Sequence, residues 1–240
     1  MLCKKRLTLQ ARALRKWEVV TFVASLLTTI TMKKIAWILV VVLALLVGMI
    51  PISYLTDVKQ GYLELKSPET RQNTFWQIGF VTHIAFGAVA IMVGWLQFSH
   101  KLLTNFPKWH RIIGKTYVIT GLLCSGAGIF IGFYAHGGPI AMAGFVCGGC
   151  VYFYTTLRGY VLIRAKNVVK HQAMMTYSYA ACLGAVSLRI FIPLSVLLPY
   201  EYTSVYNVVA WLSWLFNLGI AFWVNKKRGS PYKQGRMAAI

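Results

Sequence analysis

The sequence predicts an all-α fold: a polytopic membrane helix bundle of six transmembrane helices with both ends in the cytoplasm. Three observations support this fold class. Apolar residues make up 58% of the 240 residues. Only 12% are charged, whereas an ordinary soluble domain carries about a quarter. The apolar residues also gather into runs long enough to cross a bilayer, so lipid is the expected surrounding of most of the chain.

The six runs define the predicted spans. A helix needs about 20 mostly apolar residues to cross roughly 30 Å of hydrocarbon, and its backbone groups must be satisfied within the helix. Six stretches bounded by charged or turn residues meet this requirement. They cover residues 35–55, 75–98, 112–134, 140–163, 173–198 and 205–224. Pro193 is expected to kink the fifth helix, because proline removes a backbone donor.

The distribution of charge predicts the orientation, since cytoplasmic loops of membrane proteins retain Lys and Arg. Basic residues crowd the segments before the first span and after the last, and the loops near residues 105 and 167 are basic without an acid. The loops on the opposite side hold Asp57, Glu64, Glu69 and Glu201. Both ends are therefore predicted to be inside, and the expected location is the inner or plasma membrane.

The N-terminal segment is predicted to stand apart from the bundle. Residues 19–30 are apolar but too short to span, and Met32-Lys33-Lys34 follows at once. A start at Met32 would resemble a signal anchor. We therefore expect residues 1–31 to be a cytoplasmic or interfacial arm or an over-extended start, and residues 32–240 to form a single transmembrane domain.

Composition also narrows the function classes. The net charge of +20 is spread between apolar runs, as on the cytoplasmic face of a bilayer, so lipid rather than nucleic acid is the expected partner. Cys147 and Cys150 form a C-x-x-C pair inside an apolar run, where close packing is a better explanation than zinc binding. The sequence has no phosphate-binding or dinucleotide-binding motif, and no acid within a span for hydrolysis by paired carboxylates.

Polar residues inside the spans are the candidates for function, because ionisable groups there are costly and normally face the bundle interior. His83 and Arg189 each lie about 12 Å below the outer end of a span. This common depth predicts that they face one another in a pocket. On each of the two helices, small and polar residues follow at helical spacing on the same face as His83 or Arg189. Gln97, Tyr117 and Ser178 are predicted to line the same pocket.

Several of these residues belong to a longer pattern. It contains His83, Gln97-Phe98, His110-Arg111-Ile112-Ile113-Gly114-Lys115-Thr116-Tyr117, His171, Met174-Met175, Ser178-Tyr179-Ala180 and Leu188-Arg189. The pattern resembles domain-of-unknown-function family 2306, a family of predicted multi-pass membrane proteins that are mostly bacterial. The resemblance covers roughly residues 79–195 and implies a four-helix core at about 75–198 with a shared pocket. It implies no particular activity. The chain has His171-Gln172 and Tyr177-Ser178 where the family pattern would have His-Arg and Arg-Ser-Tyr.

Three functions remain open at this point, and the sequence does not decide whether the protein is an enzyme. The first is a haem-linked or quinone-linked membrane redox protein. Neutral imidazoles from different helices can ligate haem iron axially, and His110 with His171, both near the cytoplasmic end, is the better pair. Arg189 could then meet a propionate of haem b near His83. The layout is similar to that of di-haem transmembrane cytochromes.

The second function is a transporter-like binding protein for a small molecule, proton or quinone, with His83 and Arg189 in a cavity open to the outside. The third is a non-catalytic subunit or assembly factor whose glycine-rich faces dock a membrane protein. If His110 and His171 are solvated residues at the interface, neither needs a ligand. Arg189 stays charged, and because no span contains an acid, we expect an anionic or carbonyl-bearing ligand beside it.

Overall fold

The computed structural model describes residues 34–53, 66–195, 197 and 199–228. The chain divides into two compact units, residues 1–43 and 44–240, each of which is described by itself. The predicted arm at residues 1–31, the alternative start at Met32, and Asp57 and Glu64 lie outside the described residues. In the first unit the described residues are helical, as part of a helix at Lys34–Ser53.

The prediction of six membrane-spanning helices is confirmed. Six helices are long and apolar enough to cross a membrane, and the described residues contain no strand. The helices are Lys34–Ser53, Thr74–Phe98, Pro107–Gly132, Gly138–Arg164, Val168–Ser195 and Tyr202–Arg228. The third and last helices extend beyond the predicted apolar runs into polar sequence, because a helix does not end where its contact with lipid ends.

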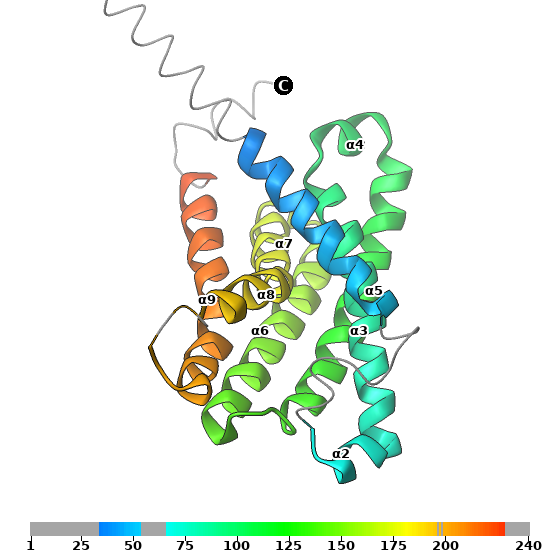
Figure 1. Ribbon diagram of the computed structural model, residues 1–240. Coiled ribbons are helices and arrows are strands. Elements are labelled where there is room, and N and C mark those ends of the chain that lie inside the picture. Colours follow the sequence, from blue (N-terminus) through cyan, green and yellow to red (C-terminus); the bar gives the residue numbers. More distant parts are fainter. Residues whose placement is uncertain (1–33, 54–65, 196, 198, 229–240) are drawn as a thin grey trace, which may run out of the picture. The chain divides into compact units, whose positions relative to one another are not determined.

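The elements of the second unit follow one another with short connections (Figure 1). They are α2 (Pro68–Gln72), α3 (Thr74–Gly94), the 3-10 helix η2 (Trp95–Phe98), α4 (His100–Asn105), α5 (Pro107–Gly132), α6 (Gly138–Arg164), α7 (Val168–Cys182), α8 (Gly184–Ser195) and α9 (Tyr202–Arg228). The second span consists of α3 and η2, and the fifth of α7 and α8.

Local sequence explains where these helices begin. Asn73 and Asn167 cap α3 and α7 by accepting hydrogen bonds from the backbone N–H groups of Trp76 and Lys170. Pro107 opens α5, where its missing N–H costs nothing. Before α6, Gly137 has a φ of 92°, a left-handed conformation that favours glycine.

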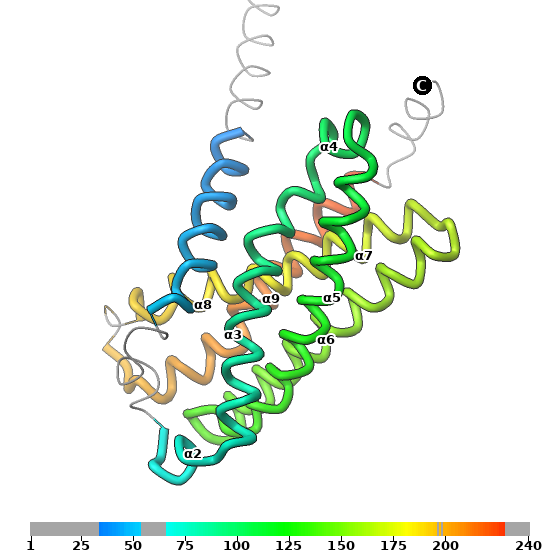
Figure 2. The backbone as a smooth tube through the Cα atoms, turned by 90° about the vertical axis from the view of Figure 1, so that its right-hand side faces the viewer, coloured from blue at the N-terminus to red at the C-terminus, as the bar shows by residue number. Residues whose placement is uncertain are grey.

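The helices pack as neighbours in the order of the chain. The helix α3 packs on α5, α5 on α6 and α6 on α7, while α9 packs against α6, α7 and α8. Figures 1 and 2 show α3, α5 and α6 running side by side. Gly144 lets α9 approach α6 closely, since a Cβ there would lie 3.1 Å from Trp211. The buried Trp214 indole donates a hydrogen bond of 3.1 Å to the Gly144 carbonyl oxygen.

The fifth span is interrupted at Leu183, between α7 and α8. Pro193, where the sequence predicts a kink, lies inside α8, which continues to Ser195. At the interruption the Leu183 carbonyl oxygen accepts from the N–H groups of Val186 and Ser187 at 2.9 and 3.1 Å. The change of helix therefore comes before Arg189 and places this residue on the separate short helix α8.

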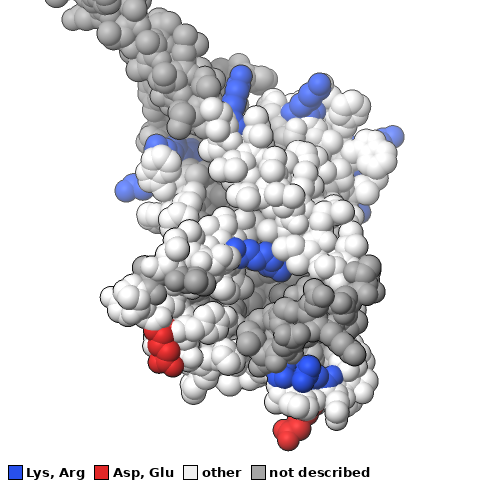
Figure 3. All heavy atoms as spheres, in the orientation of Figure 1, with Lys and Arg blue, Asp and Glu red and all other residues white. Residues whose placement is uncertain are grey.

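The described charges are not cleanly separated along the second unit, because Arg71 shares α2 with Glu69 and Lys66 lies two residues before this helix. The described acids are Glu69 and Glu201, and Figure 3 shows the acidic groups of the visible face gathered at one end. The last turn of α9 carries Lys226, Lys227 and Arg228, and Lys227 lies 3.3 Å from the centre of the Trp223 ring. The placement of both chain ends in the cytoplasm stays a prediction.

Candidate functional site

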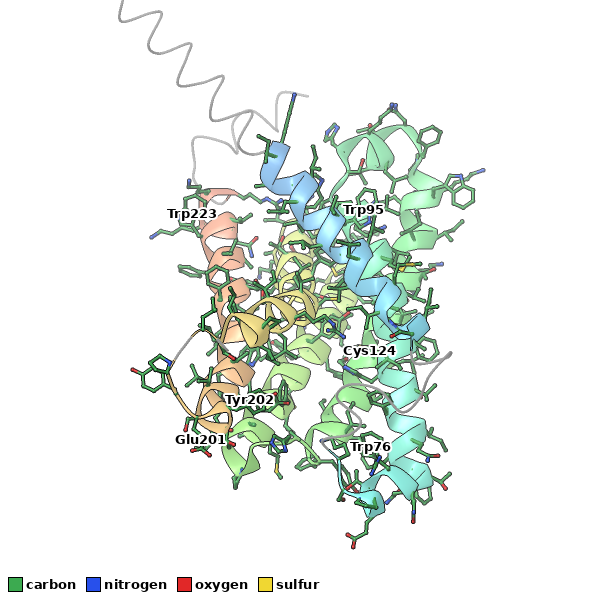
Figure 4. All side chains as sticks on the ribbon, in the orientation of Figure 1. Trp76, Trp95, Cys124, Glu201, Tyr202 and Trp223 are labelled. Atoms are coloured by element: carbon green, nitrogen blue, oxygen red, sulfur yellow. The ribbon has the colours of Figure 1, made fainter. Side chains whose placement is uncertain are left out.

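A cavity of about 470 Å³ lies inside the second unit, with lining residues on α3, α5, α6, α7, α8 and α9. Small-molecule sites commonly have volumes of roughly 300–1,000 Å³. Most of the lining is apolar or glycine, and its polar groups are few. Figure 4 shows two of the lining residues, Trp76 toward the end that holds Glu201 and Cys124 farther along the bundle.

His83 on α3 lines this cavity with a fixed ring orientation. Its Nδ1 atom lies 2.9 Å from the backbone carbonyl oxygen of Cys124 on α5. A carbonyl oxygen can only accept, so Nδ1 carries the proton and Nε2 is the ring nitrogen left for another partner. The ring packs over Gly128, where a Cβ would lie 2.8 Å from Nδ1. The glycine therefore makes room for the imidazole.

Arg189 on α8 lines the same cavity. Its guanidinium donates from Nη1 to the Ala185 carbonyl oxygen at 3.0 Å, one turn earlier in the helix. The side chain of Arg189 as a whole is exposed. The two residues chosen from the sequence for their common depth thus lie on one cavity.

Two further polar side chains line the cavity and have no hydrogen-bond partner among the described residues. They are the indole N–H of Trp76, 3% exposed, and the hydroxyl of Tyr152, 6% exposed. The Tyr152 hydroxyl lies near Tyr117 and Cys182, but neither is placed for an ordinary hydrogen bond. Most buried polar groups in proteins are hydrogen-bonded. Each unpartnered group therefore points to a partner that the described residues do not supply.

The sequence argument did not select these two residues. Trp76 lies seven residues before His83, and this spacing places both on one face of α3. That spacing was the available signal for Trp76. For Tyr152 the sequence offers none, because aromatic residues occur along α6 on both its buried and its exposed faces.

Tyr117 and Ser178, expected to line the pocket, lie beside it in a hydrogen-bonded core. The Tyr117 hydroxyl is 2.9 Å from Ser178 Oγ, which is 2.7 Å from Thr156 Oγ1. All three side chains are fully buried. These bonds join α5, α6 and α7, and none of the three residues is among those that line the cavity.

Gln97, the third residue expected in the pocket, lies in η2 and also outside the cavity lining. With its amide nitrogen turned toward the His110 carbonyl oxygen and its amide oxygen toward the Gly114 N–H, both distances are 3.2 Å. The side chain therefore joins η2 to the first turns of α5. Its contacts account for its position without a ligand.

His110 and His171 lie outside the cavity lining. Each precedes a member of the Tyr117–Ser178 hydrogen bond by seven residues, or about two turns on the same helix face. The Nδ1 atom of His171 lies 2.8 Å from the Gly159 carbonyl oxygen. Nδ1 of His110 is buried without a partner in the described structure.

No group of three or more His, Cys, Asp or Glu side chains within the described residues could hold a metal ion. The cysteines of the C-x-x-C pair, Cys147 and Cys150, are both exposed on α6.

Comparisons with known proteins identify a family. A model of the family described as "Predicted membrane protein (DUF2306)" matches residues 80–224, which is more than half of the 240 residues. The match includes α9 and so reaches beyond residue 195, where the resemblance in the sequence pattern ended. Comparison with curated proteins and with solved structures gave no match. His83, Tyr152 and Arg189 all fall inside the matched segment.

Proposed function

The chain belongs to the predicted membrane protein family DUF2306, and we propose that it binds a small amphipathic molecule with an anionic or carbonyl-bearing head group inside its helix bundle. One observation carries this proposal. The cavity that presents His83 and Arg189 also presents two buried polar groups without partners, Trp76 and Tyr152.

The polar lining favours a ligand with acceptor oxygens. An indole N–H can only donate a hydrogen bond, and a guanidinium can only donate and stays charged. Carboxylates, phosphates and carbonyl groups satisfy such donors. The rest of the wall includes Phe80, Ile84 and Ile192, which favour an apolar body. Quinones and lipid-like carboxylates combine both features.

Binding in this cavity is the step that a quinone-linked redox protein and a transporter-like binding protein would share. The first experiment therefore tests binding itself. Protein purified in mild detergent is titrated with octanoate and with octylamine, which have the same chain length but opposite charge. Tryptophan fluorescence reports occupancy, because Trp76 and Trp214 both line the cavity.

We expect saturable binding of octanoate and no saturable binding of octylamine, since the wall presents hydrogen-bond donors and two cations, Lys66 and Arg189. Equal binding of both amphiphiles would mean that they only partition into apolar space. Absence of saturable octanoate binding would remove the proposed function.

A second candidate is a b-type haem protein, supported by a different observation. His83 and His171 each donate Nδ1–H to a backbone carbonyl oxygen, at 2.9 and 2.8 Å. This is the arrangement of most metal-ligating histidines, which leaves Nε2 for the metal. At the cavity, His83 would hold the iron and Arg189 would pair with a propionate. We rank this candidate second. The two histidines expected to form the better haem-binding pair, His110 and His171, lie outside the cavity. About two turns from them, the hydrogen bond between Tyr117 and Ser178 already joins their helices, α5 and α7.

An absorbance spectrum of protein expressed with sufficient haem tests the second candidate. A Soret band that disappears in His83→Ala and remains in His136→Ala would place haem in the cavity. His136 is a suitable control because it lies in a turn, with its ring centre 5.9 Å from that of Tyr206. A spectrum without a Soret band would exclude haem b.

A further inference from the structure

We infer that the ligand carries a second polar group at the end of its apolar body away from its head group, and that the Tyr152 hydroxyl binds this second group. The inference rests on the proposed function and names the class of ligand more closely. It depends on where Tyr152 lies relative to His83.

The distance between His83 and the Tyr152 hydroxyl can be estimated from the residues of α5 that each of them contacts. The His83 ring packs over Gly128, and the Tyr152 hydroxyl packs over Gly121, each 2.8 Å from the place that a Cβ would occupy. These glycines are seven residues apart on one face of α5, or about 10 Å along its axis. Cys124 and Ser125 lie between them and line the cavity. The cavity therefore has the groups of His83 and Tyr152 at two levels, and the lining between them combines Cys124 and Ser125, whose hydroxyl donates to the Gly121 carbonyl oxygen, with apolar Ile84 and Ala88.

The level of Tyr152 lies deeper in the bundle than that of His83. The contacts between α3 and α5 show this, because residues later in α3 contact residues earlier in α5. From one end to the other the pairs are Gly79 with Ile131, His83 with Gly128, Gly87 with Cys124, and Gly94 with Tyr117. Trp76 lies before Gly79 in this order, at the level farthest from Tyr152. Gly121, which marks the level of Tyr152, lies between Cys124 and Tyr117.

The Tyr152 hydroxyl has no hydrogen bond among the described residues. The neighbouring Tyr117 hydroxyl is bonded to Ser178, and Ser178 to Thr156. The Thr156 hydroxyl donates to the backbone carbonyl oxygen of Tyr152 at 2.7 Å. The side chain of Tyr152 is 6% exposed. An oxygen atom of a ligand in the cavity is the partner that fits.

The ligand class follows from these positions. It is an elongated molecule with a carboxylate or carbonyl group near His83 and Arg189, an apolar middle, and a hydroxyl or carbonyl group roughly 10 Å deeper in the bundle. An ω-oxygenated carboxylate has this form. A simple fatty acid has only the first of the two polar groups.

Octanoate and its ω-hydroxy derivative test the inference, because they differ only in the terminal hydroxyl. We expect the wild-type protein to bind the ω-hydroxy compound about fivefold to tenfold more tightly, the range for one hydrogen bond in a buried site. Tyr152→Phe should bind the two compounds equally. It should also unfold at the same temperature as the wild type or higher, since the removed hydroxyl has no partner in the unliganded protein.

Tyr154→Phe is the matched control, because Tyr154 lies on the same helix but is 60% exposed. It should retain the preference for the ω-hydroxy compound. Equal binding of both compounds by the wild type, or a preference that survives in Tyr152→Phe, would overturn the inference while leaving the proposed function intact. If the wild type binds neither compound, the proposed function itself fails.

Discussion

Replacing Arg189 with methionine is expected to lower the affinity for octanoate by about 10-fold to 100-fold. A hydrogen bond to a charged group contributes about 1.5–3 kcal/mol, and each 1.4 kcal/mol corresponds to about a factor of ten in affinity. Methionine keeps an unbranched apolar chain and removes the charge. Its effect should therefore fall on the ligand head group and leave the packing of α8 largely unchanged.

Arg158→Met is the matched control for this variant. Arg158 lies in α6 and is exposed like Arg189, but it is not part of the cavity wall. The control should bind octanoate like the wild type when both are titrated under the same conditions. If Arg189→Met folds, inserts into the membrane and binds octanoate with unchanged affinity, Arg189 is a structural residue and the pocket hypothesis should be dropped.

Replacing Gly94 with alanine is expected to destabilise the bundle by about 1–3 kcal/mol, the usual cost of overpacking a core. A Cβ at this position would lie 2.5 Å from the ring of Tyr179 and 2.8 Å from that of Tyr117. Neither ring can move away easily. Tyr179 donates to the Ile91 carbonyl oxygen at 3.2 Å, and Tyr117 is bonded to Ser178.

Gly126→Ala provides the comparison, because no heavy atom lies within 4 Å of its added Cβ. In a helix interior, alanine is more favourable than glycine by roughly 0.5–1 kcal/mol. The control should therefore be as stable as the wild type or more stable. Thermal unfolding in detergent, followed by tryptophan fluorescence, measures both variants. Equal stability of the two would show that the rings accommodate the methyl group.

The helices were predictable from the sequence because the length of an apolar run directly reflects the thickness of the bilayer. The interruption at Leu183 was not predictable in this way. The residues around it, Ala181 to Gly184, continue the apolar run without a charge or a proline. What distinguishes the position is the packing of Gly184 against Trp214 of another helix, where a Cβ would lie 3.3 Å away.

The site was predictable only for residues that are unusual in a membrane span. His83 and Arg189 are ionisable and stand out in an apolar run. Trp76 and Tyr152 do not, because tryptophan and tyrosine are common on membrane proteins. Their importance lies in having no partner, and this depends on residues from several helices. The same limit explains Tyr117 and Ser178, whose hydroxyl groups were assigned to the pocket but bond to each other.

The interruption at Leu183 divides the fifth span into halves with different attachments. The first half, α7, is held to α5 and α6 by the bonds of Ser178. The second half, α8, packs mainly on α9, where Ser187 donates to Asn217 at 3.1 Å. Arg189 belongs to the second half, whereas His83 and Tyr152 belong to α3 and α6. The position of Arg189 therefore depends on the packing of α8 against α9, whereas the positions of His83 and Tyr152 depend on the packing of α3, α5 and α6 against one another.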